Sequence, residues 1–233
     1  MKTRSYEKEI MDEFSTGGEV MDQTLRELRF INKWLGGNKV TLQGLAKLFR
    51  QYNTSTKTLQ IADLGCGGGD MLICMSRWVR KRQQPVQFTG IDANEYIVGY
   101  AQKHTSSYPE ISYLNLDVFS EDFRQQSYDI VTGTLFCHHF TDEQLISLFR
   151  NLRQQVRVGI VINDLHRHWF AYHSIKWLTR WFSRSDMVKY DAKLSVKRGF
   201  LRSDWEKILN QAGIKKYELT WCWAFRWRLV IFA

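Results

Sequence analysis

A glycine-rich loop is the motif in this sequence with the clearest chemical meaning. Ile61 to Asp70 reads IADLGCGGGD and closes an apolar run. Glycine lets the backbone turn tightly and approach a ligand closely, and the first turn of a following helix offers free N–H groups. No Lys-Ser or Lys-Thr follows, as a P-loop requires, and Asp70 would repel the pyrophosphate of a dinucleotide. The loop therefore favours neither of these two nucleotide sites.

Two acidic residues come directly after the next two apolar runs. Asp92 follows Val86–Ile91, and Asp117 follows Ile111–Leu116. A carboxylate at the end of the second strand of an α/β sheet can accept hydrogen bonds from both hydroxyls of a ribose. Asp117 can accept from an adenine amino group while the N–H of Val118 binds a ring nitrogen. The two acids and the loop therefore predict a ligand with a ribose and an adenine, bound at three consecutive strand ends.

These motifs resemble those of the class I S-adenosylmethionine-dependent methyltransferases. The resemblance includes Asp63-x-Gly65-x-Gly67-x-Gly69 and Tyr128-Asp129-Ile-Val131, and it covers about residues 57–165. It implies S-adenosyl-L-methionine as the cofactor, with its methionyl end at the glycine loop, where the absence of a pyrophosphate makes Asp70 acceptable. The cofactor-binding residues that it implies are Asp63, Gly65, Gly67, Gly69, Asp92, Ala93, Asp117, Val118 and Gly133.

Histidines gather where the expected fourth and fifth strands end. The fourth strand runs into His138 and His139, and the fifth ends in Asn163-Asp164-Leu165-His166. An imidazole titrates near neutral pH and can deprotonate a phenol or an enol. The double histidine resembles the small-molecule branch found in ubiquinone and menaquinone biosynthesis. We take His138, His139, His166 and His173 as candidate bases, with a purely structural role for the first two left open.

Only two prolines occur in the chain, Pro85 and Pro109. Methyltransferases that modify amines of DNA bases resemble one another in an Asn/Asp-Pro-Pro-aromatic motif, and cytosine C5 enzymes in a Pro-Cys motif. Neither motif can be formed here, so we expect no DNA partner.

The pattern at residues 169–182 predicts an unusual helix, because four large rings recur at four-residue steps: Trp169, His173, Trp177 and Trp181. Lys176, Arg180 and Arg184 lie on another face. Three interpretations stay open: a helix packed on the core, an aromatic lid that places His173 inside a pocket, or transient contact with a membrane surface. The following Tyr190–Arg198 is expected to be a loop.

A metal site is a further possibility at the end of the fifth strand. Asp164, His166, His168 and His173 include an x-His-x-His-x spacing that can ligate zinc. Nothing else in the sequence supports such a site, and we predict no metal.

Short apolar runs alternate with amphipathic segments from residue 57 onward, which predicts an α/β fold. The fold class expected is a Rossmann-like, seven-stranded, mostly parallel sheet with helices on both faces and an antiparallel terminal hairpin. We expect residues 1–56 to form an N-terminal helical extension that ends in a linker at Asn53–Thr56. Residues 57–233 are expected to form the methyltransferase core, with a helical lid inserted near 166–200. The expected strands are Thr58–Leu64, Val86–Ile91, Ile111–Leu116, Tyr128–Thr132, Val158–Asn163, Lys215–Trp221 and Phe225–Phe232; the expected helices include Asp70–Gln83, Glu95–His104, Asp142–Gln155 and Ser203–Ala212.

Composition sets the remaining bounds. The 233 residues are 44% hydrophobic and 24% charged, which is ordinary for a globular protein. No apolar run approaches the roughly 18 residues of a membrane span, no secretory signal precedes the first helix, and the four cysteines show no C-x-x-C spacing. We therefore expect a cytoplasmic protein with free thiols.

The predicted function is methyl transfer from S-adenosyl-L-methionine to a hydroxyl or ring carbon of a lipophilic small aromatic, polyketide-like or quinone-like acceptor. The net charge of +9 keeps an RNA methyltransferase as an alternative, although the cations are spread over several segments rather than gathered in one patch. A catalytically silent cofactor-binding protein is the second alternative. The sequence does not identify the acceptor.

Overall fold

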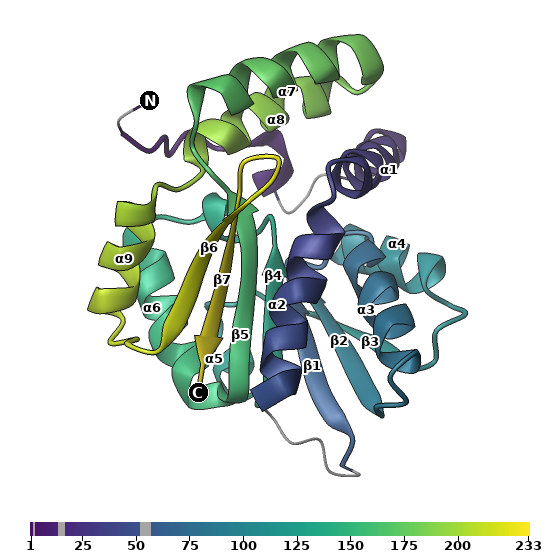
Figure 1. Ribbon diagram of the computed structural model, residues 1–233. Helices are drawn as coiled ribbons and strands as arrows, with labels where there is room; N and C mark the ends of the chain where they lie inside the picture. Colours follow the sequence, from purple (N-terminus) through teal and green to yellow (C-terminus); the bar gives the residue numbers. More distant parts are fainter. Residues whose placement is uncertain (2, 14–16, 52–56) are drawn as a thin grey trace.

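A single seven-stranded sheet forms the centre of the molecule in the computed structural model, which describes residues 1, 3–13, 17–51 and 57–233 (Figure 1). The strand order is β3-β2-β1-β4-β5-β7-β6. β7 runs antiparallel to both β5 and β6, and the other neighbours are parallel, so the predicted fold class is confirmed. The strands are β1 (Leu59–Leu64), β2 (Val86–Asp92), β3 (Ile111–Asn115), β4 (Tyr128–Thr134), β5 (Val156–Leu165), β6 (Tyr217–Cys222) and β7 (Arg226–Phe232).

Helices cover both faces of the sheet. On one face α2 (Gly37–Gln51) and α3 (Asp70–Arg80) share a core with β1 and β5, and α4 (Glu95–His104) packs beside β2 and β3. The other face is covered by α5 (Glu121–Arg124), α6 (Asp142–Gln155) and α9 (Arg202–Gln211). β1, β4 and β5 are buried along nearly their whole length, as strands covered on both sides must be.

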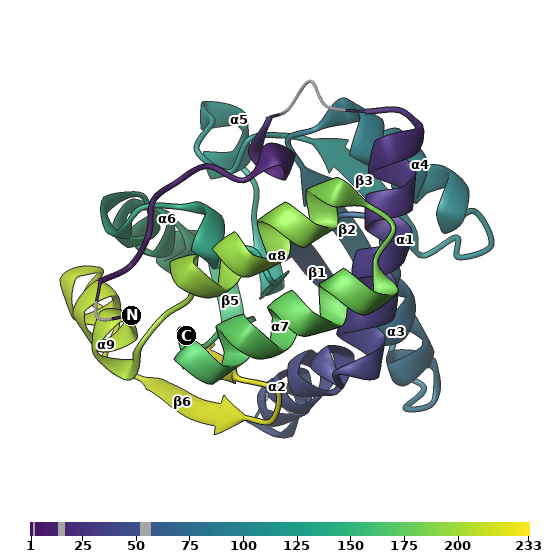
Figure 2. The ribbon, with the colours of Figure 1, turned by 90° about the horizontal axis from the view of Figure 1, so that it is seen from above.

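The carboxyl edge of the sheet carries a second group of helices. α7 (Trp169–Phe182) and α8 (Asp186–Arg198) lie side by side above this edge, next to α1 (Glu19–Trp34) and the N-terminal segment (Figures 1 and 2). Two short 3₁₀ turns, η1 (Ile10–Asp12) and η2 (Cys137–His139), face the same region. Ligands of open α/β sheets bind at this edge, so these elements surround the expected site.

The N-terminal prediction is correct only in part. Helices form at 19–34 and 37–51, but residues 3–13 are extended apart from η1, so the expected helix there is wrong. α2 packs directly on the sheet, because its Leu45 and Leu48 join Ile61 and Val161 in one core cluster. The expected linker at 53–56 lies outside the described residues.

The segment Tyr190–Arg198, expected to be a loop, is the second half of α8. The Ser185 side chain caps this helix by accepting a hydrogen bond from the Val188 N–H. Leu194 and Val196 are buried, so packing stabilises this helix although its composition is largely polar. In the described part of the chain no helix is both long and apolar enough to cross a bilayer. All four cysteines are free thiols, as predicted.

Candidate active site

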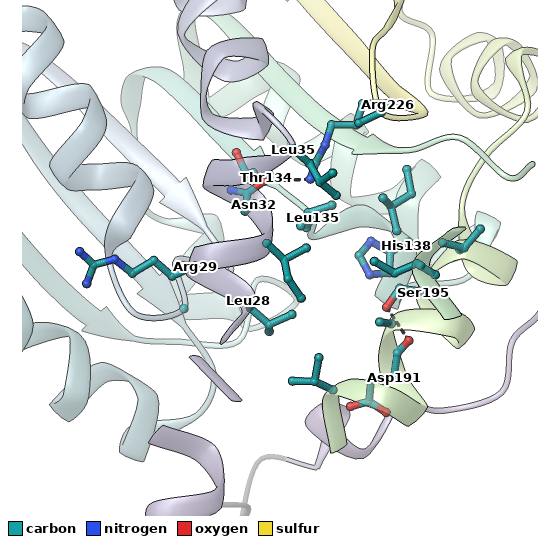
Figure 3. A pocket seen from close by; sticks show the side chains of 18 of the residues that line it. Leu28, Arg29, Asn32, Leu35, Thr134, Leu135, His138, Asp191, Ser195 and Arg226 are labelled. Carbon is teal, nitrogen blue, oxygen red and sulfur yellow. Dashed lines mark hydrogen bonds between the residues drawn. The ribbon is translucent and has the colours of Figure 1, made fainter. Parts of the chain in front are cut away.

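A cavity of about 690 Å³ opens above the carboxyl ends of the strands (Figure 3). The glycine loop forms one end, and His138 and His139 lie on its floor. α1 contributes one wall through Leu28 and Leu35, and α8 the facing wall through Asp191 and Ser195. The apolar residues that line it include Leu25, Leu28, Ile31, Leu35, Leu165, Phe170, Ile175, Leu178, Val188 and Val196.

The glycine loop has the backbone geometry that a close ligand requires. Gly65, Gly67 and Gly69 have φ values of 60°, 50° and 78°, in the left-handed region that favours glycine. A Cβ on Gly67 would have no neighbour nearer than Leu25 Cδ2 at 3.9 Å, so this face of the loop is open to the cavity. Gly69 caps the N-terminus of α3. The loop can therefore cradle a ligand against its backbone.

The predicted acids occupy successive strand ends. Asp92 closes β2 and accepts hydrogen bonds from the Gly67 N–H (3.2 Å) and the Asn94 N–H (3.1 Å), and burial raises its pKa. Asp117 follows β3, is exposed, and accepts from the Phe119 N–H at 2.9 Å. Each carboxylate has lone pairs left for hydroxyl or amino donors of a ligand.

The remaining predicted cofactor residues are distributed around the loop. Asp63 is buried at the end of β1, where it accepts from Thr132 Oγ1 at 2.6 Å; burial raises its pKa to about 7. Asp63, Gly65 and Gly67 line the cavity. Ala93 follows Asp92, Val118 is buried behind Asp117, and Gly133 lies on β4 beside Ile162, outside the cavity wall.

His138 is held by a buried carboxylate. Its Nδ1 lies 2.7 Å from Asp164 Oδ1 at the end of β5, and its backbone N–H donates to Asp164 Oδ2 at 3.2 Å. Both side chains are almost fully buried. Burial opposes ionisation of Asp164, but the adjacent His138 outweighs it and lowers the pKa of the carboxyl. A histidine oriented in this way by an acid is the arrangement of a general base.

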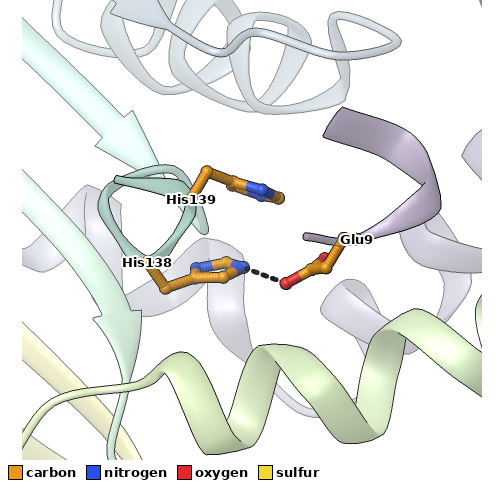
Figure 4. A group of neighbouring side chains, drawn as sticks. All are labelled: Glu9, His138 and His139. Atoms are coloured by element: carbon orange, nitrogen blue, oxygen red, sulfur yellow. Dashed lines mark ion pairs between the residues drawn. The ribbon is translucent and has the colours of Figure 1, made fainter. Parts of the chain in front are cut away.

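Two acids from the N-terminal segment, Glu9 and Asp12, complete the histidine cluster; Figure 4 shows Glu9 beside His138 and His139. Asp12 Oδ1 lies 2.5 Å from His139 Nδ1, and Glu9 Oε1 lies 3.7 Å from His138 Nε2. Ser195 Oγ donates to Glu9 Oε2 at 2.9 Å, whereas Glu9 Oε1 has no hydrogen-bond partner among the described residues. Burial raises the pKa of Glu9 to about 7. The sequence analysis missed both acids, because nothing in their local sequence marks them.

Arg198 and Asp191 fix this N-terminal segment. The Arg198 guanidinium donates to Asp12 Oδ2 at 2.6 Å and to the Glu7 carbonyl at 2.8 Å. The two oxygens of Asp191 accept from the backbone N–H groups of residues 10 and 11, at 2.9 and 3.1 Å. The segment is therefore part of the site wall although it is 126 residues or more from the histidines in sequence.

A metal could be considered at Glu9, His138 and His139, whose ligand atoms lie within 4.8 Å of one another. Both histidines have a carboxylate on Nδ1, as metal-bound histidines often do. However, the Arg198 Nε lies only 3.8 Å from Glu9 Oε1, and this fixed positive charge opposes a cation at the same place. The zinc ligands considered in the sequence analysis around Asp164 and His166 do not form a cluster, because the Asp164 carboxylate is hydrogen-bonded to His138 instead.

The other two candidate bases differ in position. His166 lines the cavity and its Nδ1 accepts from Trp221 Nε1 at 3.1 Å; burial and the neighbouring His168 and Arg167 lower its pKa. His173 is exposed and does not line the cavity, so the expectation that it lies inside the pocket is wrong. α7 turns Ala171, Ser174, Ile175 and Leu178 toward the cavity instead.

Arg226 is a further residue of the cavity wall that the sequence analysis missed. It is 2% exposed, and its guanidinium donates to the side-chain oxygens of Asn32 at 2.9 Å and Asn163 at 3.4 Å. Its Nε has no hydrogen-bond partner, and no carboxylate of the described residues pairs with it. Burial lowers its pKa to about 10. The nearby Asp164 favours the charged form of Arg226 but forms no ion pair with it, which leaves the guanidinium suited to an oxygen of a bound ligand.

Comparisons with known proteins agree with this geometry. Residues 61–159 match the profile of the methyltransferase domain family. No curated protein matches the chain in sequence. Among solved structures, the plantazolicin methyltransferase BpumL in complex with SAH and a desmethylPZN analogue has a TM-score of 0.65 at 16% identity, covering 90% of each chain.

Two further structures share the fold. Magnesium protoporphyrin IX methyltransferase (ChlM) from Synechocystis PCC 6803, with bound SAH, has a TM-score of 0.56 at 18% identity, over 88% of this chain and 87% of that one. Human N-acetylserotonin methyltransferase in complex with SAM has a TM-score of 0.65 at 17% identity, over 98% of this chain. The chain spans only 59% of the human enzyme and 57% of a matched protein from Nostoc punctiforme PCC 73102.

The family match assigns residues 61–159 to the methyltransferase domain family, and the strand order and the glycine loop agree with the class I fold that the sequence predicts. The predicted methyltransferase domain is thus confirmed over these residues, and matched structures that contain SAM or SAH share its fold.

Proposed function

We propose that this enzyme methylates an oxygen or a ring carbon of a lipophilic small molecule, with His138 as the general base. The observation that carries the proposal is the Asp164-oriented His138 in a largely apolar cavity that also contains the glycine loop. An apolar cavity with a few convergent polar groups is the usual form of a small-molecule site. Two of the matched structures are of enzymes named for plantazolicin and for magnesium protoporphyrin IX.

The cofactor is assigned to the loop end of the cavity. Asp92 would accept from its ribose hydroxyls, Asp117 and the Val118 N–H would bind its adenine, and Gly65 and Gly67 would allow its methionyl end to lie on the backbone. When bound, S-adenosylmethionine supplies a methyl group on a positively charged sulfur, which makes the methyl electrophilic. Asp63, at the cavity wall beside the loop, would bind its amino group.

His138 and Asp164 would remove the acceptor proton. Asp164 holds Nδ1–H of His138, so Nε2 is the nitrogen that accepts a proton from the acceptor hydroxyl or from a ring carbon acidified by a neighbouring carbonyl. The imidazolium that forms is stabilised by the buried carboxylate. The cavity walls exclude water and align the acceptor with the methyl group, which lowers the entropic part of the barrier.

Arg226 and Glu9 would select the acceptor. The buried guanidinium favours an acceptor with an acidic hydroxyl or a carbonyl oxygen, and Glu9, neutral below about pH 7, can donate a hydrogen bond to such an oxygen. The leucines and isoleucines between them favour an acceptor that is apolar elsewhere.

The test uses cofactor labelled on its methyl group, mixed with the enzyme and an extract of the source organism. Label that enters an organic solvent supports a lipophilic small acceptor, and a His138→Gln variant should reduce it by about 100-fold or more. Label that precipitates with RNA would instead support the RNA methyltransferase alternative. No transfer to any fraction, with cofactor binding intact, would contradict the proposal and favour a silent cofactor-binding protein.

A further inference from the structure

Large aromatic side chains are exposed to solvent on the elements that enclose the cavity, and Phe170, Trp221 and Trp223 among them line it. We call them the aromatic rim. Each is between 49% and 76% exposed, although large rings are among the side chains most favourably removed from water. The rim consists of Phe30 and Trp34 on α1, Trp169, Phe170, Trp177, Trp181 and Phe182 on α7, and Trp221 and Trp223 at the β6–β7 turn.

The elements that carry the rim also form the cavity wall. α1 lines the cavity with Ile31, α7 with Ile175, and the β6–β7 turn with Phe225. Seen from above the carboxyl edge, α7 crosses the face of the molecule between α8 and the β6–β7 turn (Figure 2). The rim residues therefore all belong to elements that enclose the same cavity.

The stretches of chain that carry the rim residues contain basic but no acidic side chains, although α1 as a whole also contains Glu19, Asp22 and Glu27. Residues 28–50, 165–185 and 219–233, which contain all the rim residues, include no aspartate or glutamate. Lys33, Lys176, Arg180 and Arg184 lie among the rim residues in sequence and are exposed. Over the whole chain the net charge is +9. A surface that is apolar in part and negatively charged therefore complements the rim.

We propose that the aromatic rim docks on an anionic lipid bilayer, so that the mouth of the cavity opens toward the membrane. Tryptophan and phenylalanine insert at the boundary between headgroups and acyl chains, and lysine and arginine beside them bind anionic headgroups. A contact of this kind lies on the membrane and needs no spanning helix. It would let a lipophilic acceptor pass from the bilayer into the cavity without crossing water.

The experiment is sedimentation of the full-length protein with vesicles of phosphatidylcholine containing about 30% phosphatidylglycerol, compared with pure phosphatidylcholine. We expect binding to the anionic vesicles that weakens as salt is raised. A Trp177→Ser/Trp181→Ser variant should bind at least about tenfold more weakly, because two exposed rings of the rim are lost. A Lys176→Glu/Arg180→Glu variant should lose the preference for phosphatidylglycerol.

A Lys57→Glu/Lys81→Glu variant is the matched control. It makes the same change in net charge, but Lys57 precedes β1 and Lys81 caps the C-terminus of α3, so both lie at the opposite edge of the sheet. It should bind vesicles like the unmodified protein. Equal weakening in this control would overturn the proposal, because the attraction would then depend only on total charge.

Two further results would contradict the docking proposal. One is the absence of binding to either vesicle; the other is a dimer in solution that the Trp177→Ser/Trp181→Ser variant converts to a monomer, which would assign the rim to a second copy of the chain. Binding of S-adenosylhomocysteine reports whether each variant is folded. The inference rests on the proposed function only for the nature of the acceptor, since vesicle binding needs no methyl transfer and can fail or succeed independently of it.

Discussion

The two ends of the cavity differ in the kind of groups that form them. At the proposed cofactor end, the glycine loop lines the cavity and would bind largely through its backbone, and the Asp92 carboxylate, at the end of the adjacent strand and outside the cavity wall, accepts a hydrogen bond from the Gly67 N–H. At the acceptor end, Glu9, His138 and Arg226 act through side chains that come from the first, middle and last parts of the sequence. The proposed cofactor end is therefore formed by residues close in sequence, whereas the proposed acceptor end depends on contacts between distant parts of the chain.

The largest effect on turnover is expected from replacement of His138. His138→Gln removes the general base and should lower kcat by about 100- to 10,000-fold, while the affinity for S-adenosylhomocysteine stays unchanged. Turnover is measured by transfer of labelled methyl into the organic fraction, and affinity by calorimetry. Normal turnover in this variant, with a loss in His139→Gln, would move the base to the neighbouring histidine.

Asp92→Ala tests the other end of the cavity. The substitution removes the acceptor for the Gly67 and Asn94 N–H groups and for the ribose, so the affinity for S-adenosylhomocysteine should fall by about 100-fold or more. Asp117→Ala, at an exposed carboxylate, should cost about tenfold or less. Calorimetry measures both; full affinity in the Asp92 variant would contradict the assignment of the cofactor site.

Asp191→Ala tests whether the N-terminal segment belongs to the acceptor end. The variant leaves two backbone N–H groups without their acceptor, which should cost roughly 1–3 kcal/mol of unfolding free energy. The KM for the acceptor should rise, while cofactor affinity should not change. Denaturant unfolding and steady-state kinetics measure these effects. A change confined to cofactor affinity would show that the two ends are not independent.

Glu9→Gln should give a smaller effect that depends on pH. The folded protein holds the Glu9 proton up to about pH 7, whereas the unfolded chain releases it near the ordinary value of 4.5. The unfolded state therefore binds fewer protons between these values, and the native protein loses stability as pH rises through this window. Glu9→Gln removes that loss, so its Tm relative to the native protein should increase from pH 5 to pH 8. A Tm difference independent of pH would mean that Glu9 is ionised throughout.

Removal of metal should have the smallest effect. Because Arg198 occupies the vicinity of Glu9, EDTA should leave both turnover and cofactor affinity unchanged. Loss of turnover in EDTA, restored by zinc, would instead assign Glu9, His138 and His139 as metal ligands.

Sequence patterns were sufficient for the sheet and for much of the cofactor end. The boundaries of α4 and α6 agree with the predicted ones, and the strands agree within two residues, because burial on both faces imposes apolar runs and local caps end the helices. The loop predicted for Tyr190–Arg198 is instead part of α8, because its polar composition hides a narrow buried stripe that packing against α7 and the N-terminal segment stabilises.

By itself, then, the sequence determined the fold class and the glycine loop, because both depend on periodicity and on backbone freedom that neighbouring residues encode. The tertiary structure was needed to show which histidine is hydrogen-bonded to Asp164 and that Glu9 and Asp12 lie beside the histidines. It was also needed to show that Arg226 is buried in the cavity wall. These contacts join residues between 26 and 194 positions apart, and no local pattern records them. They cannot be predicted locally because the protonation state and the hydrogen-bond partners of a side chain depend on its neighbours in space.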